Sequence, residues 1–478
     1  MKNLLIITLI IKGLHLQAQE GKVLTLQECV EIAIENNLNV QRSELNLKTA
    51  EINLMQANAQ RYPTLNANGS YGFNWGRSID PNSNLFVNQR INTAVLGANG
   101  RMPLIQGLRV SNGIKQSKTD LLAGDFDLQR AKNDISIRIA SLFLTVILNK
   151  ELLETAKFQL ESGKQQLGQT KKLVASGALP LANELQLESQ VATGEVTLTN
   201  NQNSLDLSLL DLKQALLLPP GVEIDVVVPE ISDFSTEVEG INSQEVYEYA
   251  LSNQPEIKAA DARVKSSNLA LEAARGALFP SLNLNGNINT NYSNAVDQIF
   301  IPNGGDPTTR LVPTNFETSN GTAIVQRVEV PSGEIEDYKV RDQWNDNLRY
   351  SVSLGLFIPI INGFSNRAAM QRAKINVQQA ELNAREEKNV LYQTVENAYR
   401  NALAASRTYF ASEKQVAALR ETYRALENQY NNGAANFTDY QVAGNNLFQA
   451  QSDLSRAKYD FIFRKKILDF YLGKPLSF

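Results

Sequence analysis

The chain contains one sequence pattern twice. Glu28–Pro63 aligns without a gap to Glu245–Pro280, at an offset of 217 residues. Further on, MPLIQG at 102–107 matches IPIING at 358–363, at an offset of 256. Because each copy would be a unit of about 200 residues, the repeat is too long for a solenoid. The fold must therefore be built from two similar halves.

The N-terminus has the pattern of a secretory signal peptide. Lys2 is followed by an apolar run over Leu4–Ile11, and Ala18 supplies a small residue at a plausible cleavage point. A charged start, a short hydrophobic segment and a small residue are the parts of such a signal. We expect residues 1–18 to be removed, since the apolar run is too short to span a bilayer as a helix.

Composition excludes several functional classes. His15 is the only histidine and lies in the signal, and Cys29 is the only cysteine, so the common nucleophile–base pairs and internal disulfides are excluded. Without Lys2 and Lys12 the chain has 44 basic and 50 acidic residues, which argues against nucleic acid as a partner. We expect no enzyme, no cofactor and no metal site. Since Glu28 is wrong for a lipoprotein attachment site, we expect Cys29 to occupy an apolar helix position.

Each half is expected to begin with a helix that ends at a proline. The first should cover residues 25–61, because Thr25 and Glu28 form a capping box and Pro63 disfavours helix in the residue before it. In the second half we expect Ser243 to supply the cap.

Strict alternation of polar and apolar residues follows each helix. A period of two predicts strands with one polar and one apolar face. A soluble, half-buried sheet would fit the period, but its solvated face would carry Lys and Glu, and here that face is mostly asparagine and serine. The apolar face ends in aromatic residues, as in membrane barrels, and about 10–11 residues suffice to cross a bilayer when a strand is tilted. We expect the barrel lumen to be lined by Asn66, Asn68, Asn283, Asn285 and Asn287.

Very long helices complete each half. No proline interrupts the 68 residues of 109–176 or of 365–432, and Gly177 and Gly433 should end these coiled-coil helices. The second hairpin carries a 39-residue insertion rich in Pro, Gly, Thr and Asn, which suits an exposed outer loop. The expected organisation is a first repeat at 19–218 (hairpin 64–102, helical hairpin 109–217), a linker at 219–243 and a second repeat at 244–478 (hairpin 281–358, helical hairpin 365–472).

Four strands per chain cannot close a membrane barrel. Unpaired strand edges are not tolerated in hydrocarbon, so the barrel must be shared between copies of the chain. Two copies would give eight strands, a number whose interior is filled by side chains, and three would give twelve. A lumen lined by asparagine and glycine favours three copies.

Several segments together resemble the TolC-type outer membrane efflux proteins. They are YNNG at 430–433, FTDY at 437–440 and AQSDL at 450–454, the duplicated order, and the junction prolines Pro63, Pro103, Pro280 and Pro359. The resemblance covers essentially the whole mature chain. It implies a homotrimer with one shared 12-stranded β-barrel above an α-helical periplasmic tunnel. It also implies an outer membrane channel that passively conducts substrates from an inner-membrane transporter, through a periplasmic adaptor, in efflux or type I secretion.

The resemblance also implies a periplasmic gate. Tyr430 and Asp439 match a tyrosine and an acidic ring of that gate, whereas Asn183, Ala435 and Val442 replace two acids and an arginine. We therefore expect an entrance held by packing and neutral hydrogen bonds, with Asp439 either lining the pore or only capping a helix.

The tips of the two helical hairpins are the expected adaptor-docking site, and a plain helix–helix turn is the alternative. The docking residues would be Gly177, Ala178, Gly433, Ala434 and Asn436. A non-conducting trimeric coiled-coil fibre with a structural or adhesive role is the alternative function, but it leaves the asparagine-faced hairpins unexplained.

Overall fold

The computed structural model describes residues 22–79, 85–88, 90–229 and 240–474. The predicted signal peptide and residues 230–239 of the predicted linker lie outside this part of the chain. The chain divides into two compact units. Of the described residues, the helical unit comprises 22–54, 115–229, 240–268 and 374–474, and the strand unit comprises 55–79, 85–88, 90–114 and 269–373.

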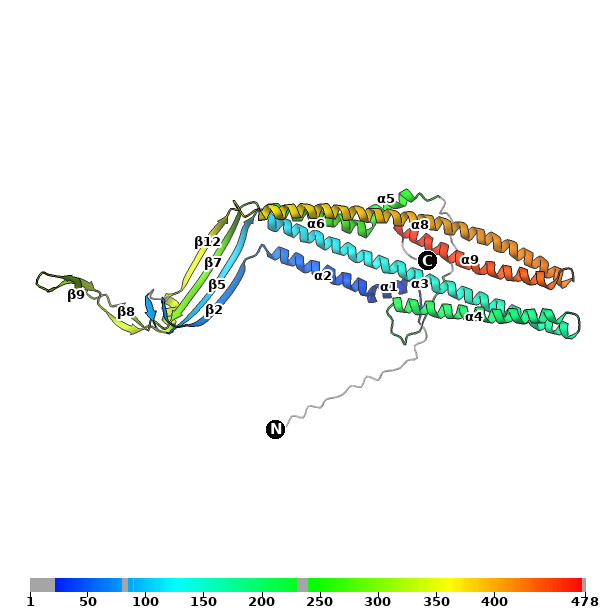
Figure 1. Cartoon of the computed structure of the whole chain (residues 1–478), viewed down its shortest axis with the longest axis horizontal. Helices are drawn as coiled ribbons and strands as arrows, with labels where there is room; N and C mark the ends of the chain where they lie inside the picture. Colours follow the sequence, from blue (N-terminus) through cyan, green and yellow to red (C-terminus); the bar gives the residue numbers. More distant parts are fainter. Residues whose placement is uncertain (1–21, 80–84, 89, 230–239, 475–478) are drawn as a thin grey trace, which may run out of the picture. The chain divides into compact units, whose positions relative to one another are not determined.

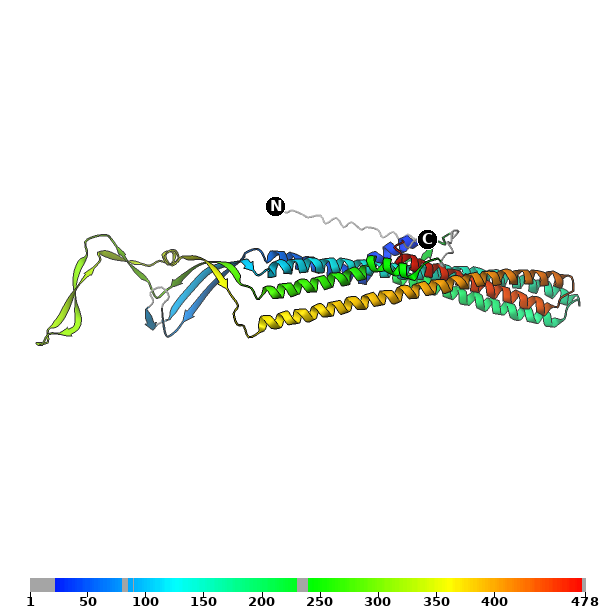
Figure 2. The ribbon, with the colours of Figure 1, turned by 90° about the horizontal axis from the view of Figure 1, so that it is seen from above.

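The helices of the chain include two long antiparallel hairpins. In chain order the described helices of the protein, apart from the short α7, are α1 (Leu26–Asn36), α2 (Leu38–Ala59), α3 (Arg109–Ala175), α4 (Leu181–Ala215), α5 (Ser243–Asn253), α6 (Pro255–Gly276), α8 (Ser365–Asn431) and α9 (Phe437–Tyr471). Helices α3 and α4 form one antiparallel hairpin, and α8 and α9 form the other (Figures 1 and 2). The predicted uninterrupted helices are confirmed, since α3 and α8 each have 67 residues.

The prediction of one continuous first helix is wrong. Asn37 has extended backbone (φ −65°, ψ 125°) and separates α1 from α2. Its side-chain oxygen accepts hydrogen bonds from the amides of Asn39 and Val40, at 2.9 and 3.2 Å, so it starts a new helix as a cap does. In the second half Gln254 is equally extended and separates α5 from α6.

The capping box at the start of α1 is confirmed. The Thr25 hydroxyl accepts from the Glu28 amide at 3.3 Å, and the Glu28 carboxylate accepts from the Thr25 amide at 2.8 Å. The predicted cap Ser243 is wrong, because Asn242 is the N-cap of α5 and accepts from the Gln244 amide at 3.0 Å. The offset of 217 indeed places Asn242, not Ser243, opposite Thr25.

The core of the helical unit lies where the helices converge. One apolar cluster joins α1, α3 and α4 and includes Ile139, Phe143, Ile147 and Leu212. A second cluster joins α5, α6, α8 and α9 around Val246, Ile257, Val395 and Phe461. A small parallel pair, β1 (Lys22–Leu24) with β6 (Ile224–Val226), brings part of the predicted linker to the first cluster.

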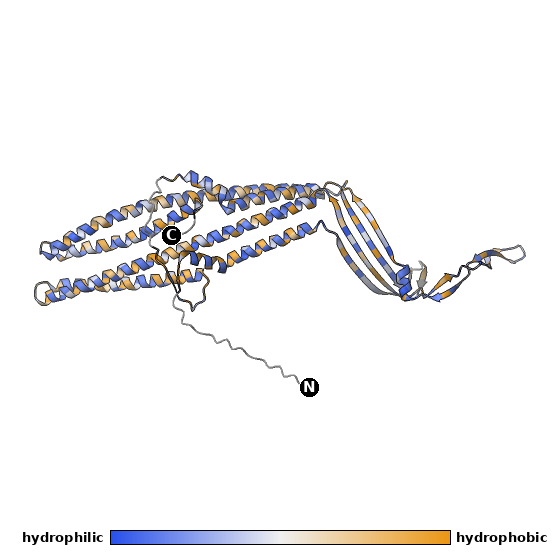
Figure 3. Ribbon diagram, turned by 180° about the vertical axis from the view of Figure 1, so that it is seen from behind, coloured by the Kyte–Doolittle hydropathy of each residue, from blue (hydrophilic) through white to orange (hydrophobic). Residues whose placement is uncertain are grey.

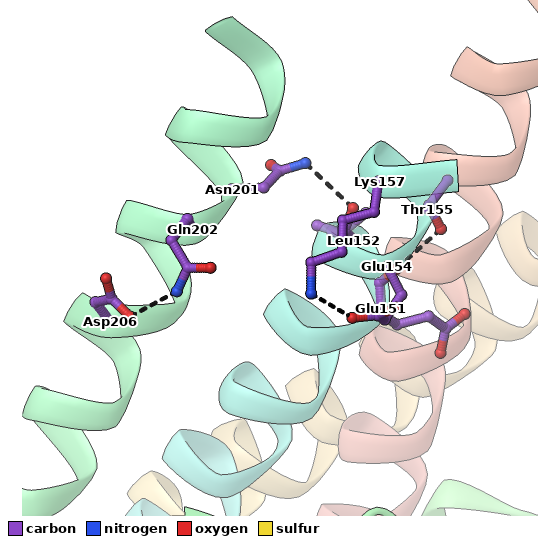
Figure 4. A network of polar contacts seen from close by, with 8 residues as sticks. All are labelled: Glu151, Leu152, Glu154, Thr155, Lys157, Asn201, Gln202 and Asp206. Carbon is purple, nitrogen blue, oxygen red and sulfur yellow. Dashed lines mark hydrogen bonds and ion pairs between the residues drawn. The ribbon is translucent and has the colours of Figure 1, made fainter. Parts of the chain in front are cut away.

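Polar contacts supplement the packing between α3 and α4. The Asn201 amide donates to the Leu152 carbonyl at 3.2 Å, which ties the two helices together (Figure 4). Other contacts in that view stay within one helix, such as Gln202 to Asp206 at 2.9 Å. Contacts between exposed residues of one helix contribute little, so the hairpin depends mainly on its apolar seam.

The strand unit is centred on a four-stranded antiparallel sheet in the order β12-β7-β5-β2. The strands are β2 (Thr64–Asn74), β5 (Ile91–Gln106), β7 (Ser281–Ser293) and β12 (Arg349–Phe357). Hydrophilic and hydrophobic residues alternate along them (Figure 3). The predicted alternating strands are therefore present, and the second hairpin lies beside the first through β5 and β7.

The predicted return strand of the first hairpin extends beyond its expected end. Pro103 lies inside β5, opposite Asn283 of β7, and a register shift follows between Pro103 and Ile105. Pairing of β5 with β2 already ends at Arg101 and Thr64, so this stretch has a neighbouring strand on one side only. Proline lacks an amide donor and is tolerated at such edges and bulges.

The predicted outer loop contains regular structure. Strands β8 (Gln298–Pro302) and β11 (Gly333–Asp337) pair, and so do β9 (Thr308–Glu317) and β10 (Ala323–Val330). The short helix α7 (Val340–Asp346) follows them, and a smaller pair, β3 (Arg77–Ile79) with β4 (Phe86–Asn88), lies in the first hairpin. None of the helices in the described part of the chain combines the length and hydropathy of a membrane span.

Candidate functional site

The two helical hairpins turn in the same way. At the first tip the Ala178 amide donates to the Leu173 carbonyl at 2.8 Å, and Gly177 has φ +75°. At the second tip Ala434 donates to Gln429 at 2.8 Å, and Gly433 has φ +73°. A bond of this span with a left-handed residue before the donor is a Schellman motif, which favours glycine. Both glycines are therefore explained by the turn itself.

Asp439 takes part in the cap of α9. The Asn436 side-chain oxygen accepts from the Asp439 amide at 2.8 Å, and the Asn436 amide donates to the Asp439 carboxylate at 2.7 Å. A carboxylate in the first turn also interacts favourably with the helix dipole. A structural role of Asp439 thus accounts for its position, while its exposed carboxylate remains available to face a pore.

Aromatic rings gather behind the second tip. Tyr430 stacks on Tyr440 with ring centroids 5.1 Å apart and planes 3° apart, and Tyr440 also stacks on Tyr423 at 5.4 Å. Phe437 packs against Tyr430 at 5.9 Å. We call these four residues, together with Gln166 and Gln441, the tip cluster. Ring stacking of this kind adds about 0.5–1.5 kcal/mol per pair beyond burial.

Neutral hydrogen bonds in the tip cluster join the two hairpins. The Gln166 amide of α3 donates to the Tyr440 hydroxyl of α9 at 2.9 Å, and the Gln441 amide donates back to Gln166 at 3.2 Å. The Tyr423 and Tyr440 hydroxyls are 2.9 Å apart. Burial raises the pKa of Tyr440, and the hydrogen bond with Tyr423 raises it further, so the phenol stays neutral at physiological pH.

A second clasp between the hairpins contains a charge. Glu151 of α3 accepts hydrogen bonds from the Ser455 and Tyr459 hydroxyls of α9, at 2.7 and 2.6 Å. Burial raises the pKa of Tyr459, and the hydrogen bond to Glu151 adds to it. Hydrogen bonds to an ionised acceptor are among the stronger ones in proteins, so the bonds to Glu151 should be stronger than the neutral bonds between Gln166 and Tyr440.

The structure brings together only part of the predicted gate. Tyr430 joins the tip cluster, but within the described residues no hydrogen bond or ring contact links Asn183 to Tyr430 or Asp439. Sequence reasoning missed Tyr440, Tyr423 and the amides that bind them. The quoted FTDY segment contains Tyr440, but its partner Gln166 lies 274 residues away, and no sequence pattern relates the two.

The predicted lumen asparagines share one face of the sheet. Asn66 pairs with Asn99 of β5, which pairs in turn with Asn287 of β7. The side-chain oxygen of Asn283 is buried and accepts from Gln106 at 2.9 Å and Arg101 at 3.4 Å. The face is therefore polar across the strands, and β5 contributes residues that the sequence argument did not name.

The other predicted junction prolines lie at or near strand ends. Pro63 directly precedes β2, Pro280 directly precedes β7, and Pro359 follows β12 by two residues. The docking residues Gly177, Ala178, Gly433, Ala434 and Asn436 are all exposed.

A family comparison agrees with this architecture. The model of the family described as "Outer membrane efflux protein" matches residues 29–216 and 246–474. The chain belongs to the outer membrane efflux protein family. The two matched stretches begin 217 residues apart, which is the offset of the internal repeat.

Relatives and solved structures of the family cover most of the chain. The cation efflux system protein CusC of Escherichia coli K12 is 22% identical over 441 residues, covering 89% of this chain and 81% of CusC. Nodulation protein T of Rhizobium leguminosarum bv. trifolii is 21% identical over 456 residues, covering 94% and 85%. The crystal structure of VceC from Vibrio cholerae matches with a TM-score of 0.72 at 16% identity, covering 94% of this chain and 96% of VceC.

Family membership decides between the functional classes left open by the sequence. The protein is an efflux channel of the outer membrane with a periplasmic extension, and the family is not one of enzymes. The match to CusC structures, with a TM-score of 0.69 over 94% of this chain, agrees with the fold of long helices and strands.

Proposed function

We propose that the protein works as a homotrimeric channel with one 12-stranded barrel shared by three copies. In this proposal an inner-membrane transporter delivers substrates through a periplasmic adaptor, and the channel conducts them passively to the exterior. The outer face of the barrel contacts outer membrane lipid, and the asparagine face lines the lumen.

The unpaired edges and the exposed apolar face of the sheet support this proposal. Within the described strands, β2 and β12 each pair on one side only. Leu65, Tyr350 and Val352, on the apolar face, are 78–81% exposed, which suits contact with lipid. Open edges and an apolar face can coexist in a bilayer only if further copies pair with the edges, because unpaired backbone groups are costly there.

Conductance of the purified protein in planar bilayers tests the proposal. We expect discrete channel openings and a trimer band on gels that converts to monomer on heating. A non-conducting fibre would give trimers without openings, and a chain that stays monomeric in detergent would contradict the shared barrel.

The periplasmic entrance is the proposed gate. We include Tyr430 in the gate because its ring stacks on Tyr440. Asp439 is included because its carboxylate is exposed, and Asn183 only because it follows the first tip in the chain.

Near the tips Gln166 and Tyr440 join the hairpins without charge, whereas the charged contact of Glu151 lies 15 residues farther along α3. We therefore assign the closed entrance to packing and neutral hydrogen bonds. Opening would then depend less on salt than opening of a charged latch.

Substitution Asp439→Asn separates the pore role of Asp439 from the capping role. A ring of carboxylates at the entrance should favour cations, so removing it should shift the reversal potential in a salt gradient toward zero. If the reversal potential does not change, Asp439 only caps α9. Asn436→Ala is the matched control, since it removes the cap and retains the carboxylate.

The two tips are the proposed docking surface for the adaptor. Ala178 and Ala434 are exposed, and each sits in a turn fixed by a Schellman motif, so either position should tolerate cysteine. Cross-linking from Ala434→Cys should capture a periplasmic adaptor. Ser319→Cys, in the exposed outer loop, is the control and should not capture it.

A further inference from the structure

The two halves of the chain share strand registers as well as sequence. In the first hairpin Thr64 pairs with Arg101, and in the second Ser281 pairs with Phe357. These partners are related by the sequence offsets of 217 and 256. The pair Gly72–Thr93 likewise maps onto Asn289–Arg349. Shifting the two residues of a contact in one half by 217 and 256 therefore gives the equivalent contact in the other half.

Four helices of the helical unit lie in the order α2, α3, α6, α8 (Figure 1). Leu47 of α2 lies 3.5 Å from the point where a Cβ on Gly124 of α3 would stand. Arg263 of α6 forms an ion pair with Asp127 of α3, and Lys388 of α8 forms one with Asp261 of α6 at 3.0 Å. Helices α2 and α8 are therefore the outer members of the row.

Both outer helices expose apolar residues at heptad spacing. The residues are Leu38, Leu45 and Ile52 on α2 and Ile375 and Leu382 on α8, each exposed by 58–62%. A spacing of seven residues is the pattern of a coiled-coil seam. Leu45 lies on the opposite side of α2 from Leu47, which packs into the core. Each stripe thus faces away from the row and lacks a helix partner within the described chain.

The contact between α3 and α6 supplies a template for the missing partner. By the offsets, α2 corresponds to α6 and α8 corresponds to α3. Arg263 bonds Asp127, and the Ser266 hydroxyl bonds the Asp120 carboxylate, so the template helices are antiparallel. The pair Arg263–Asp127 maps onto Asn46 and Asn383, and the pair Ser266–Asp120 maps onto Thr49 and Asn376.

We propose that α8 of one copy packs against α2 of the next copy as α3 packs against α6 within the chain, with Asn383 beside Asn46 and Asn376 beside Thr49. The proposal rests on the homotrimer proposed above and names the contacts that build it. Both mapped pairs can form side-chain hydrogen bonds. Leu45 comes within roughly two residues, about 3 Å, of the level of Leu382, so the stripes cover each other.

The strand unit supports the same step independently. Within the chain β5 pairs with β7, with Asn99 opposite Asn287 and Arg101 opposite Asn285. The offsets map these pairs onto Gly355 opposite Ser70 and Phe357 opposite Asn68. The edge strand β12 of one copy would thus pair with the edge strand β2 of the next. A head-to-tail interface of this kind forms a closed ring when the rotation between copies divides a full turn, as the proposed homotrimer requires.

Cysteine pairs test the helix contact. Thr49→Cys with Asn376→Cys should form a disulfide between copies on oxidation and give covalent dimers and trimers on non-reducing gels. Ser266→Cys with Asp120→Cys is the matched control and should cross-link within one chain. Thr49→Cys with Val390→Cys, at least about 15 Å out of register by either mapped pair, should not cross-link. Burial raises the pKa of the native Cys29 thiol to about 12, so it should not interfere.

A second pair and the oligomeric state distinguish the ways of failing. Gly355→Cys with Ser70→Cys should cross-link neighbouring copies, and Gly355→Cys with Tyr71→Cys, on opposite faces, should not. If light scattering shows trimers and neither cognate pair cross-links, the proposed register is wrong and the channel stands. If the protein is monomeric and does not conduct, the homotrimer itself fails.

Discussion

At the scale of single residues, uncharged side chains of the tip cluster connect the two helical hairpins, where a salt bridge could have served instead. Tyr440 contacts the rings of Tyr423 and Tyr430 and the amide of Gln166, so one side chain connects three helices. Hydrogen bonds between uncharged groups contribute about 1 kcal/mol each. Removing one of these hydrogen bonds should therefore weaken the contact between the hairpins without breaking it.

Substitution Tyr440→Phe should loosen the proposed gate. It removes the hydroxyl that bonds Tyr423 and Gln166 and retains the ring. Losing about 1–1.4 kcal/mol should raise the open probability by about five- to tenfold in single-channel recordings. Tyr409→Phe, in another stacked pair of the helical unit, should leave the open probability unchanged. An unaltered Tyr440→Phe channel would show that these bonds do not hold the closed state.

Cys29 should be inert and carry no lipid. Its side chain is fully buried in α1, and burial raises its pKa to about 12 from 9.0. Because the folded state holds the thiol proton more tightly, the contribution of Cys29 to the free energy of unfolding is lost as pH rises from 9 through about 12. Iodoacetamide at pH 8 should modify Cys29 only in denaturant, whereas Ser319→Cys should react in the native protein. A lipid adduct in the mass spectrum would refute this.

At the scale of elements, the turn between β5 and α3 requires a glycine. Gly107 has φ +57°, and a Cβ there would overlap the carbonyl oxygen of Gly276 at the end of α6. The two backbones approach so closely that neither position has room for a side chain. Sequence alone marks Gly107 as part of the repeat, but only the packing shows why no other residue fits.

Substitution Gly107→Ala should destabilise the strand unit. Left-handed backbone costs an alanine about 1–2 kcal/mol, and the overlap with Gly276 adds a further penalty. We expect a lower melting temperature in detergent, monitored by circular dichroism. Gly113→Ala, inside α3 with open space around it, should be neutral or stabilising by up to about 1 kcal/mol. Equal melting temperatures of the two variants would argue against the close approach.

At the scale of the whole molecule, the long outer loop is separable from the channel. Strands β8 and β11 pair with each other, and β9 and β10 pair with each other, but none of them pairs with the four-stranded sheet. An isolated two-stranded ribbon is itself marginally stable at best, and among the described strands these ribbons have no pairing to the sheet. The ribbon can therefore vary without disturbing the sheet.

Replacing residues 299–336 by a short Gly-Ser turn should leave assembly and conductance intact. The replacement retains the bonds from Tyr338 to Asp297 and from Gln343 to Val296, which hold the base of the loop. Protease added to intact cells should cleave the wild-type loop and spare the shortened one. If the proposed homotrimer forms with the wild-type chain and not with the shortened variant, the ribbon takes part in assembly.

Sequence by itself determined the local features of this protein. The repeat, the period-two strands, the uninterrupted α3 and α8 and the tip glycines follow from short-range preferences that a pattern reveals. Asn37 also breaks the first helix through local capping bonds, which a closer reading of the sequence could have found. Tertiary structure decided the passage of β5 through Pro103 and the meeting of Gln166 with Tyr440. These depend on which surfaces meet. Such contacts join residues far apart in the chain, whose energies appear only when the helices and strands pack together.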